Sequence, residues 1–151
     1  MTGSLQSYEF RLGNVISDAL EASFKSAFHD VEVLSYPPND TSSYDAIIRP
    51  KVASFEFAIN DSGALVNSFL FGALGAAATS YSSDVMIRIE AEVRMPPQFN
   101  ARNIVAEGYG RKGAGTFSWK GSDFNESSGR AVSEAVNRLV TKIAYAVGEL
   151  R

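Results

Sequence analysis

The stretch from Asp84 to Arg94 constrains the fold more than any other part of the sequence. Apolar residues alternate there with mostly charged ones: Val85, Ile87, Ile89, Ala91 and Val93 form one set, and Met86, Arg88, Glu90, Glu92 and Arg94 the other. A period of two is typical of a β-strand, whose successive side chains point to opposite faces of a sheet. Because one face is apolar and the other charged, the pattern predicts an antiparallel sheet with one face in solvent and one face covered.

Two amphipathic helices are predicted near the ends of the chain. The first covers Leu12 to Phe28, with a stripe of Leu12, Val15, Ile16, Ala19, Leu20, Ala27 and Phe28 and with Phe24 near its edge. The second has a stripe of Val132, Ala135, Val136, Leu139, Val140, Ile143, Val147 and Leu150. We expect its start near Asp123, because Asp123 and Glu126 have capping-box spacing. Such stripes must be buried, which predicts an α+β fold: a two-layer sandwich with two long amphipathic helices packed on one face of a mainly antiparallel sheet.

Other extended segments complete the predicted sheet. They are a short strand at Val31–Leu34, a long one at Ala46–Ile59, and a glycine-interrupted region covering Ile104–Tyr109 and Gly115–Trp119. The apolar phase of the long strand changes near Pro50, which cannot donate to a sheet ladder. This change predicts a bulge or an edge position. We expect residues 1–7 to be a flexible N-terminal remnant and residues 8–151 to form a single α+β domain.

Composition excludes several kinds of site. The chain has no cysteine and one histidine, His29, so we expect no disulfide, no thiolate nucleophile and no metal site. A net charge of −3 with dispersed basic residues gives no field that would hold nucleic acid. The longest apolar stretch, Ala64–Ala78, contains Asn67 and Ser68 and is shorter than the roughly 20 residues that a membrane-spanning helix needs.

One motif resembles a nucleotide-binding loop. The residues Gly108-Tyr109-Gly110-Arg111-Lys112-Gly113 spell G-x-G-x-x-G, but that chemistry requires a helix to begin directly after the loop. Here the following residues predict another strand, so we interpret the glycines as sites where two backbones approach closely. No cofactor is expected.

The remaining candidates for catalysis also have simpler interpretations. His29 follows a helix end, where a cation favours the helix dipole. Glu90 and Glu92 share the charged face of a strand with Arg88 and Arg94, so charge pairing is the expected use rather than acid–base chemistry, which would need a desolvated carboxylate. We therefore predict no catalytic residue and a chain that is not an enzyme.

The apolar segment Ala64–Ala78 is the candidate for an interaction site. It lies where a polar turn would suffice, and its largest side chains are Phe69, Leu70, Phe71 and Leu74. Two interpretations stay open: a short element folded onto the core, or an exposed apolar tip that meets a protein or a membrane. Tyr109, Phe117 and Trp119 likewise fit either core packing or a stacking platform.

The order of elements resembles that of small lipoproteins of the Gram-negative envelope, notably YajG-like lipoproteins and more remotely the LPS-assembly lipoprotein LptE. The resemblance spans Leu12 to Leu150. It rests on the helix containing Ala-Leu-Glu-Ala-Ser-Phe, the strand Ala46–Val52, the strand Asp84–Arg94, and Gly113–Phe117 leading into Ala131–Leu139. It implies a periplasmic, outer-membrane-associated domain without enzymatic activity, lipid-anchored in full length, that binds a protein or another envelope component. The lipidated cysteine and its leader are absent from this sequence, and a cytoplasmic protein would look the same.

Two alternatives to a protein-binding role follow from the same pattern. A small apolar ligand or lipid could be carried between the helices and the sheet. The chain could also associate with itself as a homo-oligomer, since long strands with an uncovered edge pair readily with another chain.

Deletion of residues 69–74 tests the interaction segment. If the segment is an exposed tip, the deletion leaves the fold largely intact and abolishes association, as measured by circular dichroism and light scattering. Loss of folding would instead place these residues in the core.

Overall fold

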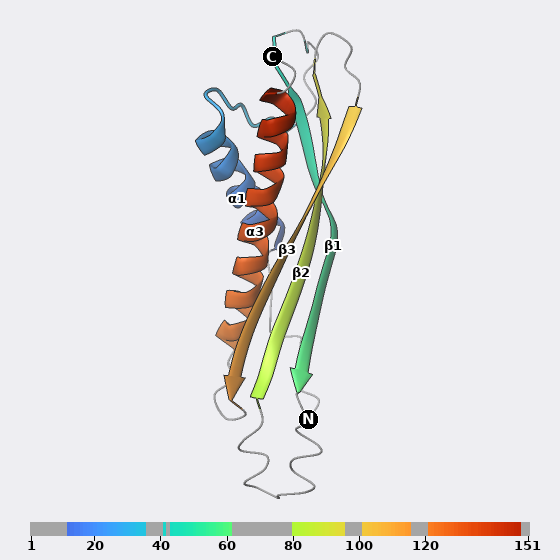
Figure 1. Ribbon diagram of the computed structural model, residues 1–151. Coiled ribbons are helices and arrows are strands. Elements are labelled where there is room, and N and C mark those ends of the chain that lie inside the picture. The colour runs from blue at the N-terminus through green and yellow to red at the C-terminus, as the bar shows by residue number, and fades with distance from the viewer. Residues whose placement is uncertain are drawn as a thin grey trace, which may run out of the picture.

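The computed structural model describes residues 12–35, 41, 43–61, 80–95, 101–115 and 121–148. Its elements are helix α1 (Leu12–Ala27), strands β1 (Ile47–Asp61), β2 (Ser80–Arg94) and β3 (Ala101–Gly115), and helix α3 (Gly121–Gly148). The strands form one antiparallel sheet in the order β1-β2-β3. Both helices lie on the same side of this sheet (Figure 1), which confirms the predicted α+β sandwich.

Strand β2 is the centre of the sheet and follows the alternating pattern throughout. The apolar set between Val85 and Val93 is at most 1% exposed, whereas Met86 and Arg88 lie on the opposite face, in solvent. Helix α3 packs directly on β2 and β3. Its Ala135, Leu139 and Ile143 are fully buried in the same core, so the sequence stripe of α3 is the surface that meets the sheet.

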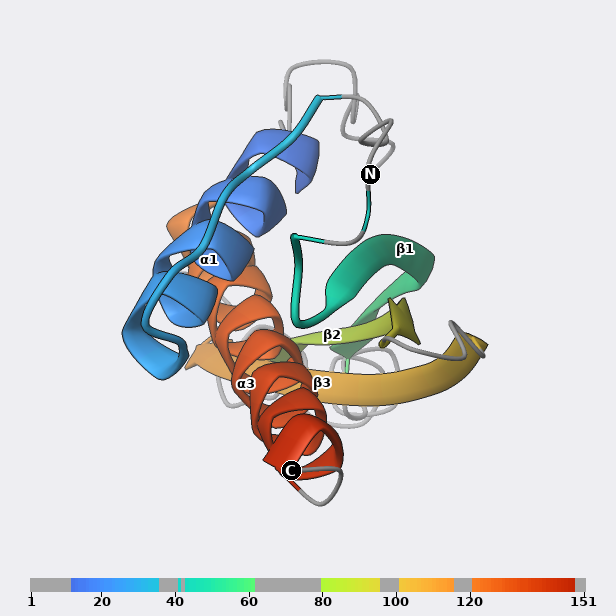
Figure 2. The same ribbon diagram turned by 90° about the horizontal axis from the view of Figure 1, so that it is seen from above.

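Helix α1 packs alongside α3 (Figure 2). Ile16, Leu20 and Phe24 are its buried residues, and Phe24 also stacks at a tilt on Phe28. The predicted stripe was therefore wrong at two positions: Val15 is 46% exposed, and Ala27 is exposed as well. The contact with a single neighbouring helix buries a narrower strip than a broad sheet surface would.

Glycines allow α3 to lie unusually close to β3. A Cβ atom at Gly108 would overlap the backbone oxygen of Ala131, and one at Gly110 would overlap that of Ser127. The predicted close backbone approach is thus confirmed, and the partner backbone is that of α3. Strand β3 contains the first predicted segment and continues through the glycines to Gly115, and the rest of the second predicted segment, 116–119, lies outside the described residues.

The long strand contains the predicted change of phase, but at a different residue. Pro50 pairs regularly with Ala91, and the register shifts between Val52 and Ser54. The bulge is therefore at Ala53. Pro50 is accommodated because β1 is an edge strand, which was the other predicted outcome.

Two local predictions were wrong. Val31–Leu34 has no regular structure: it runs back along α1 (Figure 2), away from the sheet, so its backbone finds no neighbouring strand. Helix α3 begins at Gly121, which places Asp123 in its first turn rather than at its cap. A carboxylate in the first turn still favours the helix dipole.

Substitution of Gly110 by Ala tests the close approach of α3. The added methyl would collide with the backbone of Ser127, so we expect the free energy of unfolding to fall by about 3 kcal/mol. Gly129→Ala is the matched control, because a Cβ atom there meets nothing within 4 Å. In mid-helix this control should stabilise by about 1 kcal/mol. Urea unfolding of both variants measures the difference; equal losses would contradict the tight contact.

Candidate functional site

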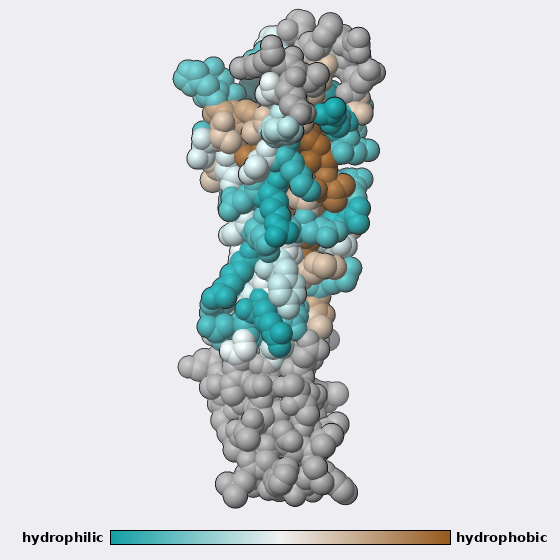
Figure 3. All heavy atoms as spheres, viewed as in Figure 1, coloured by the Kyte–Doolittle hydropathy of each residue, from teal (hydrophilic) through white to brown (hydrophobic). Residues whose placement is uncertain are grey.

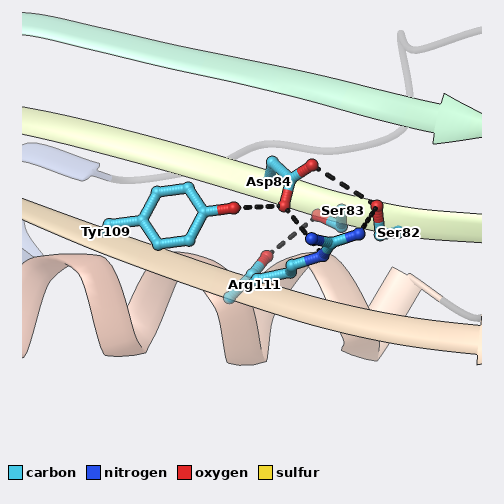
Figure 4. Close-up of polar contacts among 6 residues, drawn as sticks. Ser82, Ser83, Asp84, Tyr109 and Arg111 are labelled. Atoms are coloured by element: carbon cyan, nitrogen blue, oxygen red, sulfur yellow. Dashed lines mark hydrogen bonds and ion pairs between the residues drawn. The ribbon is translucent and has the colours of Figure 1, made fainter.

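A cluster of polar side chains lies on the outer face of the sheet, around Asp84 (Figure 4). Asp84 is on β2, directly opposite Arg111 on β3. The hydroxyl of Tyr109 donates to Asp84 Oδ1 at 2.6 Å, and that of Ser82 donates to Oδ2 at 3.3 Å. Arg111 contributes an ion pair to Asp84, with Nε 3.4 Å from Oδ1, and a hydrogen bond to Ser82 Oγ at 3.3 Å. One carboxylate thus organises three neighbouring side chains.

The electrostatics of this cluster fix the role of Tyr109. Its hydrogen bond to Asp84 raises the pKa of Tyr109 above the usual value; slight desolvation and the charge of Asp84 act in the same direction, and Arg111 opposes them. The phenol is therefore protonated at neutral pH and acts as a hydrogen-bond donor. A group in this state does not accept a proton from a substrate.

A second, buried polar contact lies on the other side of the sheet and joins it to α3. Ser83 and Ser127 are buried, and their hydroxyl oxygens are 2.9 Å apart. Ser127 donates to the backbone oxygen of Phe124 at 3.0 Å, which commits its only proton. Ser83 is then the donor in the pair. The two hydroxyls satisfy each other in the core, as buried polar groups must.

The free edge of β3 is covered by side chains of α3. Glu134 accepts a hydrogen bond from the backbone nitrogen of Tyr109 at 2.7 Å. Arg138 donates to the backbone oxygen of Glu107 at 3.1 Å, and Lys142 donates to that of Val105 at 2.7 Å. Since these three residues are spaced four apart, they lie in one row along the helix. They bind backbone groups that a further strand would otherwise need.

The same edge is reinforced near the start of α3. Lys112 of β3 forms an ion pair with Glu126 at 2.8 Å, and Arg130 pairs with the same carboxylate. The hydrogen bond from Lys112, followed by the nearby positive charges, lowers the pKa of Glu126. The pairing is therefore kept at neutral pH and is lost as the pH falls through that lowered pKa.

The opposite edge, formed by β1, has no comparable cover among the described residues. β2 is the neighbour of β1 in the sheet, and α3 lies over β2 and β3. Val52 and Phe57 face the helix side, opposite the buried Ile89 and Val85. Yet they are 41% and 48% exposed, although Phe57 makes an edge-to-face contact with Phe124. The inner surface of β1 is therefore only partly covered.

Charged residues on the outer face of the sheet pair as the sequence predicted. Glu90 lies 3.2 Å from Lys51 of β1 and 3.4 Å from Arg88, and Glu92 pairs with Arg94. His29 is exposed just beyond the end of α1, far in sequence from the Asp84 cluster. Glu90 and Glu92 thus pair with Lys51, Arg88 and Arg94.

Several predicted interaction residues cannot be placed. Phe69, Leu70, Phe71 and Leu74 lie outside the described residues, as do Phe117 and Trp119. Tyr109 is on the outer face of β3 and 51% exposed, so of its two interpretations core packing was wrong. Its hydroxyl donates to Asp84.

Sequence reasoning missed the Asp84 cluster and the row on α3. That Tyr109 and Arg111 lie on the same face of a strand could have been predicted, since residues two apart share a strand face. Their contact with Asp84 depends on the register between β2 and β3, which no local sequence pattern predicts. The sequence shows that Glu134, Arg138 and Lys142 lie outside the apolar stripe of the helix. It does not show which backbone groups of the sheet they contact.

The described surface shows no metal site and one uneven distribution of hydropathy. Within residues 12–35, 41, 43–61, 80–95, 101–115 and 121–148, no group of three or more His, Asp or Glu side chains could hold a metal ion. In that same part of the chain, no helix is long and apolar enough to cross a membrane. Figure 3 shows hydrophilic residues over most of the visible described surface, with apolar residues gathered in its upper half.

Comparison with known proteins adds no identification: the chain matches no family model, and no curated protein is similar to it.

The titration of Tyr109 tests the Asp84 cluster. Since the folded-state pKa of Tyr109 is raised, this residue contributes stability that is present below about pH 10 and is lost as the pH rises through the folded-state value. In Asp84→Asn, the negative charge is gone and the pKa of Tyr109 should fall toward its ordinary value. NMR of ring-labelled tyrosine follows the titration directly, and an unchanged pKa in Asp84→Asn would contradict the assignment.

Proposed function

We propose that this chain is a non-enzymatic binding or assembly protein of the cell envelope, and that it binds its partner along β1. The contrast between the two sheet edges carries this proposal. Side chains of α3 hydrogen-bond the backbone of β3 at its edge, whereas β1 has exposed apolar side chains on its inner surface and no covering element among the described residues. Unpaired strand edges are sites where another chain adds a strand.

The chemistry of the described polar groups supports a non-enzymatic role. The cluster around Asp84 contains hydroxyls, a guanidinium group and a carboxylate, but the raised pKa of Tyr109 keeps its phenol protonated. Ser83 and Ser127 have already used their hydroxyls on each other and on Phe124. The described serines of these contacts are thus hydrogen-bonded partners in the fold and are not paired with an imidazole base, as a serine nucleophile would be.

The location in the envelope rests on the resemblance to YajG-like lipoproteins in the order of elements. The chain has a helix, an antiparallel sheet of long strands and a long closing helix, in that order. In this proposal the domain stands in the periplasm, attached in its full-length form to the outer membrane by a lipidated cysteine. The partner is then a protein or another component of the envelope.

A photo-crosslinking amino acid at Phe57 tests the binding surface in the cells that produce the protein. We expect crosslinks to a partner from Phe57, because it is half-exposed on the inner surface of β1. The matched control is Tyr145, which is 69% exposed on α3. Fractionation of the same cells should place the protein with the envelope. Equal crosslinking from both positions, or recovery in the cytosol alone, would contradict the proposal.

A carrier of a small apolar ligand is the second candidate, and the exposure of Val52 and Phe57 favours it. Because Gly108 and Gly110 bring α3 against β3, a ligand would have to lie over β1 and not between α3 and β3. Native mass spectrometry of freshly purified protein should then show a retained lipid that is lost in Phe57→Asp. Repeatedly ligand-free spectra of the unmodified protein would count against the carrier.

A further inference from the structure

The pairing of β1 with β2 assigns each residue of β1 to a face of the sheet. Before the bulge, Ile48, Pro50 and Val52 lie opposite Val93, Ala91 and Ile89 and so share the helix-side face. After the bulge, that face is taken by Phe55 and Phe57, opposite Ile87 and Val85. The outer face correspondingly carries Arg49 and Lys51 before Ala53, and Ser54, Glu56 and Ala58 after it.

This change of phase restricts how β1 can pair with a copy of itself. In any antiparallel pair, residues directly opposite each other must lie on the same face, and a slip of one residue exchanges the faces. Most registers combine pairs that lie on one side of Ala53 with pairs that span it, and the change of phase mismatches the faces in one of these two kinds of pair. The register that places Val52 opposite Phe55 satisfies it along the whole strand, since the two bulges then face each other and Pro50 lies opposite Phe57.

The same register also places oppositely charged side chains across from each other, which is independent of the match between faces. It places Lys51 opposite Glu56, and twofold symmetry provides this pair twice. Lys51 is 72% exposed and lies 3.2 Å from Glu90 of its own chain, and its ammonium group has three protons to donate. An opposite-charge pair directly across two strands stabilises their pairing.

We propose that the partner at β1 is a second copy of this chain, paired antiparallel through β1 with Val52 opposite Phe55 and Lys51 opposite Glu56. This rests on the proposed function and names its partner. The two three-stranded sheets become one continuous sheet, and its two outer edges are the β3 edges that α3 covers. Phe55 and Val52 of the two copies meet on the helix side, where each chain alone leaves Val52 41% exposed.

Charge reversal tests both the partner and the register. Sedimentation velocity over a concentration series should show a dimer for the unmodified chain. Glu56→Lys and Lys51→Glu each place like charges opposite each other twice, so each should raise the dimer dissociation constant about tenfold or more. An equimolar mixture of the two variants restores both opposite-charge pairs and should form a dimer again. Glu107→Lys, a matched reversal on the outer face of β3, should leave dimerisation unchanged.

A disulfide test checks the register independently, because the chain has no cysteine of its own. Oxidation of a mixture of Lys51→Cys and Glu56→Cys should give a covalent dimer, since opposite Cα atoms in an antiparallel pair are about 4.5–5.5 Å apart. Either variant alone should not crosslink, because two copies of the same position would be roughly 17 Å apart along the strands. Thermal unfolding followed by circular dichroism confirms that each variant is folded.

The outcomes separate this inference from the proposed function. A chain that is monomeric at all concentrations overturns the inference, as does a dimer that the variant mixture fails to restore or that crosslinks equally from one position alone. If Phe57 nevertheless crosslinks to a different protein in cells, the binding role of β1 stands and the identity of its partner is wrong. If neither association occurs, both fail.

Discussion

The close packing of α3 on β3 is the constraint on which the rest of the structure depends. Gly108 and Gly110 remove the side chains that would hold the helix away, so backbone meets backbone over that strand. Their position has two effects. The buried residues of α3 reach the inner face of β2, and the polar row of Glu134, Arg138 and Lys142 comes within hydrogen-bond distance of the edge of β3. A helix held farther out by alanines would lose both contacts.

The two edges of the sheet therefore differ for a reason that lies in the position of one helix. Because α3 is centred over β2 and β3, it covers one outer strand and leaves the other with half-exposed apolar side chains. Pro50, Lys51 and the bulge at Ala53 make β1 a poor template for indiscriminate pairing, since proline, charge and bulges all hinder strand addition. In the proposed dimer these features restrict which strands can pair with β1, and such selectivity is what a binding surface requires.

The elements predicted correctly from the sequence are those in which the order of apolar and polar residues follows from burial against one broad surface. The alternation in β2 and the stripe of α3 from Val132 to Ile143 were both correct, because each position there depends only on whether the side chain is buried or exposed. Leu150, the last residue of the predicted stripe, lies outside the described residues. Val31–Leu34 failed because strand formation needs a neighbour, and no local pattern reveals that α1 is the neighbour instead. The bulge was expected three residues too early in the chain. The alternation of apolar residues shows that the phase changes, but it does not show which residue is inserted as the bulge. The Asp84 cluster was missed because it is made by a register between two strands.

The lengths of the elements have a consequence for what the molecule can reach. Each strand has 15 residues and α3 has 28, which corresponds to roughly 50 Å and 42 Å along nearly the same direction. Asp61 and Ser80 lie at one end of the sheet, and Arg94 and Ala101 lie at the other end (Figure 1). A contact made at one end is thus separated from a contact at the other by about the thickness of a lipid bilayer with its headgroups. A molecule that touches the side chains at one end of the sheet is therefore out of reach of the side chains at the other end.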